Sequence, residues 1–155
     1  MIYLFDWGNT IMKVFPDETG PMYLWKKVEI MPGADEMLRK LNETADCYIA
    51  TNAKDSEKED IIKALKRVGI DSYFKDIFCF REIGFPKPSK EYFEDILKRL
   101  ETEKEHITMV GDHLENDICG ALEFGFTGIL YDPDDSYPTY SGKKIKTLIT
   151  LSANI

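Results

Sequence analysis

Short apolar runs alternate with segments of helical periodicity, and this alternation constrains the fold more than any other feature of the sequence. The apolar runs have the length of buried strands and are residues 2–5, 48–50, 77–80, 107–110 and 128–131. Strands that alternate with helices need right-handed crossovers, so they form a mainly parallel sheet with helices on both faces. We therefore predict an α/β fold, a three-layer doubly wound sheet, built as a single domain over residues 1–155.

Four intervals between the strands carry apolar residues at helical spacing. Their inward faces are Met37, Leu38 and Leu41; Ile61, Ile62, Leu65 and Val68; Tyr92, Phe93, Ile96, Leu97 and Leu100; and Ile118, Ala121 and Leu122. Ser56 and Glu59 have the spacing of a capping box at the start of the second helix. A last apolar run, residues 145–151, is predicted to add a strand at one edge of the sheet.

Composition excludes several classes of protein. The chain is 43% hydrophobic and 31% charged, which is typical of a globular domain, and its net charge of −8 argues against a broad nucleic-acid surface. No apolar run approaches the roughly 20 residues of a membrane helix, and residues 1–5 lack the basic leader of a secretory signal. Three widely spaced cysteines indicate reduced thiols, so we expect a cytoplasmic protein that does not bind membranes.

Polar residues follow four of the predicted strands, either directly or, for Lys87 and Asp117, on the loop or a little later in the segment that comes after the strand. They are Asp6; Thr51 and Asn52; Lys87; and Gly111, Asp112 and Asp117. The carboxyl ends of parallel strands meet at one edge of a sheet, and ligands bind there, near the point where the strand order reverses. We therefore expect these side chains to converge on one site.

The converging side chains suit one kind of chemistry. Asp6 and Asp112 offer hard oxygen ligands, which favour Mg²⁺ over zinc. Lys87 and Thr51 can pair with the oxygens of a phosphate group. A carboxylate beside a metal ion and an amine stays ionised, so Asp6 can attack phosphorus as a nucleophile. The sequence thus predicts a phosphorylated substrate, small or macromolecular.

Four short motifs follow one another in order over residues 2–117. They are the first strand with Asp6 and Thr10, the second strand with Thr51 and Asn52, Lys87 with Pro88, and Val110-Gly111-Asp112 with Asp117. This series resembles the haloacid dehalogenase superfamily of phosphatases and phosphotransferases. The resemblance implies a Rossmann-like fold of that superfamily and a magnesium-dependent hydrolase.

The resemblance also implies a role for each matching residue. Asp6 is the expected nucleophile, which becomes an aspartyl phosphate. Mg²⁺ is expected to bind Asp6, the backbone carbonyl of Gly8, and Asp112.

The remaining matched residues are expected around the phosphoryl group. Thr51, Asn52 and Lys87 would bind it, with Thr51 and Lys87 acting in catalysis. Asp117 is expected behind these groups, where it would orient a metal-bound water molecule or Lys87.

Gly8 departs from the family pattern, which has a second aspartate at this position. That aspartate protonates the leaving group, and such general acid catalysis typically contributes about 10²- to 10⁴-fold. Three consequences stay open. The protein acts on substrates with good leaving groups, or Asp17 or Glu18 replaces the acid, or the aspartyl phosphate persists and the chain is a catalytically weakened phospho-binding or signalling module.

The spacing between motifs leaves no room for a cap domain. About 40 residues separate Asp6 from Thr51, and we interpret residues 11–32 as a short flap-like insert in place of a cap. The aromatic residues Trp7, Tyr23 and Trp25 are expected to pack this insert against the sheet. The site should then be open, as in family members that take large substrates or use a second copy of the chain in a homo-oligomer as a lid.

Overall fold

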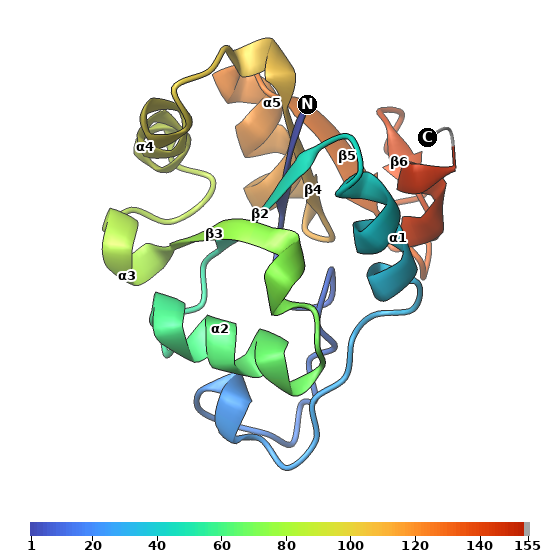
Figure 1. The fold of residues 1–155 in the computed structure, drawn as a ribbon. Coiled ribbons are helices and arrows are strands. Elements are labelled where there is room, and N and C mark those ends of the chain that lie inside the picture. Colours follow the sequence, from blue (N-terminus) through green and yellow to red (C-terminus); the bar gives the residue numbers. More distant parts are fainter. Residues whose placement is uncertain (154–155) are drawn as a thin grey trace.

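A computed structural model describes residues 1–153, and its centre is a parallel sheet of six strands in the order β3-β2-β1-β4-β5-β6 (Figure 1). The strands are β1 (Ile2–Phe5), β2 (Asp46–Thr51), β3 (Phe74–Cys79), β4 (Ile107–Gly111), β5 (Thr127–Tyr131) and β6 (Lys144–Ile145). The α-helices are α1 (Ala34–Leu41), α2 (Lys58–Arg67), α3 (Phe80–Ile83), α4 (Lys90–Leu100) and α5 (Gly120–Phe124). The predicted α/β fold is confirmed.

The strand order reverses beside β1. From β1 the chain builds outward through β2 to β3, and it then returns to place β4 on the other side of β1. Ligands bind at such a reversal in open α/β sheets. The residues that follow β1 and β4 therefore stand on either side of the expected binding point.

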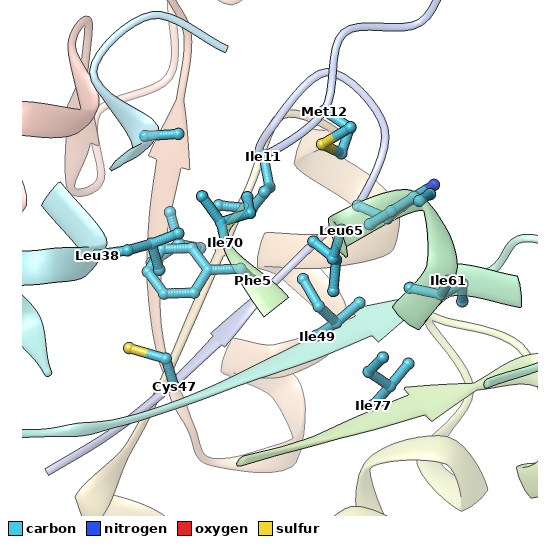
Figure 2. Packing of buried hydrophobic residues seen from close by; sticks show 14 of the residues in the cluster. Phe5, Ile11, Met12, Leu38, Cys47, Ile49, Ile61, Leu65, Ile70 and Ile77 are labelled. Atoms are coloured by element: carbon cyan, nitrogen blue, oxygen red, sulfur yellow. The ribbon is translucent and has the colours of Figure 1, made fainter. Parts of the chain in front are cut away.

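Alternate residues of the strands point to opposite faces of the sheet and build two separate cores. Phe5, Ile49 and Ile77 meet α1 and α2 on one face, where Leu38, Ile61 and Leu65 pack against them (Figure 2). Leu4, Ala50, Phe78 and Met109 meet α4 and α5 on the other face. Two buried faces give the strands their nearly continuous apolar sequence.

The C-terminal prediction was wrong in part. Of residues 145–151, only Ile145 lies in a strand, and residues Leu148–Ser152 form a 3₁₀ helix, η5. Leu148 is fully buried and Ile149 lies over Gly33, at the start of α1. Packing against α1 therefore replaces extension of the sheet edge.

Two helix details also differ from the prediction. The capping residue of α2 is Glu57, whose backbone N–H donates to the Asp60 carboxylate at 2.9 Å, so the box lies one residue after the predicted one. Leu122 is exposed, although Ala121 and Ile118 are fully buried. Adjacent helical residues point about 100° apart, so burying Ala121 turns Leu122 toward solvent.

Residues 11–32 contain one short 3₁₀ helix, η1 (Met22–Leu24), which lies below α2 in Figure 1, and the chain then rises from it to α1. Arg67 of α2 holds this segment by donating to the backbone oxygens of Tyr23 at 3.1 Å and Trp25 at 2.6 Å. Trp7 and Trp25 are buried, as expected of packing residues. Within residues 1–153, η1 and α1 are the only helices between β1 and β2, and no helix has the length and apolarity needed to cross a bilayer.

Candidate active site

The predicted site residues converge at the carboxyl ends of β1, β2 and β4. One carboxylate oxygen from each of Asp6, Asp112 and Asp117 lies within 4.8 Å of the others. These residues share a pocket of about 310 Å³. Its lining comprises Asp6, Trp7, Gly8, Thr51, Asn52, Ala53, Lys87, Asp112, His113, Asn116 and Asp117. The periodicity of the strands was thus sufficient to predict which residues meet.

Lys87 is the buried cation of the site. Its ammonium donates to Asp6 Oδ1 at 2.8 Å, to Asp117 Oδ1 at 2.7 Å and to the Ala50 backbone oxygen at 2.8 Å. These three acceptors match the three N–H groups of the ammonium. Burial alone would lower the pKa of Lys87, but the charges of Asp117 and Asp6 more than offset it, so the pKa lies above its ordinary value. Lys87 therefore stays charged and fixes the orientation of Asp6.

Asn52 fixes the backbone at Lys87. The Lys87 N–H donates to Asn52 Oδ1 at 2.7 Å, and Asn52 Nδ2 donates to the Lys87 backbone oxygen at 3.0 Å. This reciprocal pair joins the end of β2 to the loop after α3. The family motif gave no indication of it, because a contact between residues 35 positions apart has no local signature. Asn52 also lines the pocket, so its contact with substrate stays a prediction.

Thr51 presents a buried hydroxyl at the end of β2. The Ala53 N–H donates to Thr51 Oγ1 at 3.0 Å, and the residue is only 2% exposed. Because the oxygen accepts this bond, the hydroxyl hydrogen is available to a further acceptor. The geometry fits the predicted contact with a phosphoryl oxygen.

Asp117 lies behind the other carboxylates, on the π-helical turn η4 (Leu114–Cys119) that leads into α5. It is 1% exposed, and its Oδ2 accepts the His113 N–H at 3.1 Å. A side chain at Gly111 would overlap this carboxylate, so the glycine that ends β4 permits the close approach. Asp117 is thus almost fully buried and bonded to Lys87, and its role in orienting Lys87 stays a prediction.

His113 is exposed at the rim of the pocket. Its Nδ1 accepts the Asn116 N–H at 3.1 Å and caps the start of η4. That bond assigns the proton of the neutral ring to Nε2.

Asp112 is a carboxylate of the site whose pKa is raised well above its ordinary value. Burial, followed by contact with Asp6 and repulsion from Asp117, raises the pKa of Asp112 to about 7. Burial likewise raises the pKa of Asp117 to about 6, against the opposing effect of Lys87. Thr10 supports Asp112 by donating to its Oδ1 at 3.2 Å.

The donor set fits a divalent cation. The site holds three carboxylates and one ammonium group, so negative charge is in excess. The raised pKa values of Asp112 and Asp117 are in part a consequence of this excess. Oxygen-only ligands suit Mg²⁺, and a bound cation would reverse these shifts. Asp6, Asp112 and the Gly8 backbone all line the pocket and are available as ligands.

The raised pKa of Asp112 makes the stability of the metal-free protein depend on pH. Between about pH 4 and pH 7 the folded protein keeps a proton that the unfolded chain has lost, so stability falls as the pH rises through this range. An asparagine side chain at this position cannot ionise. We expect Asp112→Asn to raise the Tm in EDTA by roughly a few degrees at about pH 8 and to give no gain at about pH 4.

Thermal scans of both proteins at the two pH values measure this difference. Equal Tm changes at both values would contradict it. Added Mg²⁺ should raise the Tm of the unsubstituted protein more than that of Asp112→Asn, because a ligand stabilises the state that binds it.

The fold and the site define a class: an α/β protein that gathers acidic residues and a buried lysine at the switch point of its sheet. A profile of haloacid dehalogenase-like hydrolases matches residues 9–130. The chain belongs to this family, which confirms the resemblance.

Individual relatives agree with this assignment. The putative HAD-hydrolase YfnB of Bacillus subtilis is 32% identical over 127 residues, which cover 77% of this chain and 53% of YfnB. Ribulose-1,5-bisphosphate 5-phosphatase of Halopiger xanaduensis is 32% identical over 124 residues, covering 79% of this chain and 51% of that enzyme. The chain therefore spans about half the length of these curated relatives.

The same fold occurs in solved structures of a longer protein and of a protein of similar length. A magnesium-bound structure of YfnB has a TM-score of 0.70 and 31% identity, and the match covers 79% of this chain and 53% of YfnB. An uncharacterised protein of Listeria monocytogenes has a TM-score of 0.85 and 26% identity, and the match covers 97% of this chain and 94% of that one. The second protein is thus matched over nearly its whole length.

Proposed function

We propose that this protein is a magnesium-dependent phosphatase or phosphotransferase that acts through an aspartyl phosphate on Asp6. The observation that carries the proposal is the position of the Asp6 carboxylate, which lies against the Lys87 ammonium and beside Asp112 in an open pocket. Relatives named as phosphatases of ribulose 1,5-bisphosphate and of glyceraldehyde 3-phosphate support a phosphorylated substrate.

Four residues of the pocket take part in the proposed reaction. An oxygen of Asp6 attacks phosphorus, the bond to the leaving oxygen breaks, and its electron pair departs with the leaving group. Thr51 and Lys87 hold the phosphoryl oxygens, and Asp117 keeps Lys87 charged and in place. Water, or another acceptor in a phosphotransferase, then takes the phosphoryl group and regenerates the Asp6 carboxylate.

Asp6, the Gly8 carbonyl and Asp112 would hold magnesium, which would screen the repulsion between the anionic nucleophile and the anionic substrate. The magnesium-bound YfnB structure supports this cofactor. Residues 11–32 are proposed as a flap beside this open site. An open site accommodates either a small phosphorylated molecule or a segment of a larger one.

Initial rates with Mg²⁺ test the function. We expect hydrolysis of acetyl phosphate and p-nitrophenyl phosphate, with the rates lost in EDTA and restored by Mg²⁺. Both substrates have leaving groups that depart without a proton, which suits a site with glycine at position 8. Stoichiometric phosphorylation of the protein without turnover would favour the signalling alternative, and absence of both reactions would contradict the proposal.

A further inference from the structure

Val14 lies against Gly8, the position at which the family pattern has a second aspartate. A Cβ placed on Gly8 would lie 2.8 Å from Val14 Cγ2, which is closer than carbon atoms pack without displacement. Gly8 lines the pocket beside Asp6. A methyl group of Val14 thus crowds the position that the first carbon of a side chain at residue 8 would take.

The loop that carries Val14 holds it in this position. Its N–H donates to Asn9 Oδ1 at 3.0 Å, and Asn9 itself adopts a left-handed conformation with φ of 59°. The Asn9 N–H donates to the Met12 oxygen at 2.6 Å, which closes the turn. Valine is also stiff at χ1 because of its branched Cβ. An aspartate at position 8 would therefore have to displace an anchored residue.

Apart from Asp6, Asp112 and Asp117, no carboxylate lines the described pocket. Asp17 and Glu18, the candidates from the sequence, are both absent from its lining residues, and Asp17 is exposed. Val14 is 38% exposed, so it presents an apolar surface next to Gly8. Val14 is itself not among the lining residues, so its effect at Gly8 is to fill the space that a side chain at position 8 would need.

We propose that Gly8 and Val14 together determine the leaving-group specificity of the site, restricting it to phosphoryl compounds whose leaving oxygen is a stable anion. This inference rests on the proposed function. When Asp6 attacks, the phosphorus–oxygen bond breaks and both electrons stay on the leaving oxygen. An acyl or aryl phosphate releases a carboxylate or phenolate, which needs no proton. An alkyl phosphate would release an alkoxide and needs an acid, and this pair leaves no side chain at position 8 to supply one.

A four-protein cycle tests the proposal: the unsubstituted protein, Gly8→Asp, Val14→Ala and the double variant. The measured quantity is the ratio of kcat/KM for glycerol phosphate to kcat/KM for acetyl phosphate, at saturating Mg²⁺. We expect the double variant to raise this ratio by about 10²- to 10⁴-fold, because it adds an acid and the space for it. Gly8→Asp alone should raise it less, and Val14→Ala alone should not raise it.

Thermal unfolding gives a readout that is independent of activity. We expect Gly8→Asp to lower the Tm by about 2 to 6 °C through overpacking, and we expect much of this loss to disappear in the Val14→Ala background. Additive changes in Tm would show that Val14 does not occupy the space needed at position 8, and would overturn the inference.

The matched control replaces the acid with its neutral isostere. Gly8→Asn with Val14→Ala should leave the ratio low, since an amide cannot protonate a leaving group. A folded double variant that hydrolyses acetyl phosphate but gains nothing on glycerol phosphate overturns the inference and leaves the proposed function standing. If the unsubstituted protein turns over neither compound, the proposed function itself fails.

Discussion

Replacing Asp6 with asparagine is expected to abolish turnover, lowering kcat for acetyl phosphate by roughly 10⁴-fold or more. Asparagine keeps the shape of the side chain and an oxygen that can accept the Lys87 hydrogen bond, so the pocket should persist. The amide is a poor nucleophile and a weaker ligand for Mg²⁺. Steady-state rates, together with phosphoryl transfer from labelled acetyl phosphate to the protein, measure the effect.

Two controls separate the nucleophile from a simple metal ligand. Glu94→Gln removes an exposed carboxylate on α4 and should leave the rate unchanged. Excess Mg²⁺ should not rescue Asp6→Asn if Asp6 carries the phosphoryl group, whereas a variant that has lost only metal affinity would recover. Recovery of the rate at high Mg²⁺, or equal labelling of both proteins, would contradict the nucleophilic role.

The convergence of the site could be predicted because it depends on regular structure. Asp6, Thr51 and Asp112 each lie at the end of a parallel strand or immediately after it, and such ends meet at one edge of a sheet whatever the loops do. The apolar alternation of the strands likewise sufficed to predict the layers. Periodicity is a local property of the sequence, so it can be analysed without coordinates.

The contacts that tune the site could not be predicted, because they join loops of irregular conformation. The pairing of Asn52 with the Lys87 backbone and the packing of Val14 on Gly8 depend on backbone paths that no period describes. The C-terminal residues show the same limit. Their apolar run is compatible with a strand or a packed helix, and tertiary packing on α1 decided between them.

Replacing Lys87 with methionine is expected to have the largest effect on stability. The substitution keeps much of the side-chain volume but leaves Asp117 buried and Asp6 partly buried without their cation. Breaking a buried ion pair by removing one partner typically costs about 3–5 kcal/mol. We expect a loss of this size in the free energy of unfolding at about pH 8 in EDTA, measured by urea denaturation.

The pH dependence and a second substitution show whether unpaired charge causes that loss. At about pH 5, protonation of Asp117, which has lost its cation, should reduce the loss in the free energy of unfolding. Asp117→Asn in the Lys87→Met background should recover part of that free energy. Lys90→Met, on the exposed start of α4, is the matched control and should change stability little. A penalty that is unaffected by pH and by Asp117→Asn would mean that Lys87 stabilises the protein by packing alone. The three hydrogen bonds of its ammonium argue for the electrostatic cause, because an aliphatic stem needs no such partners.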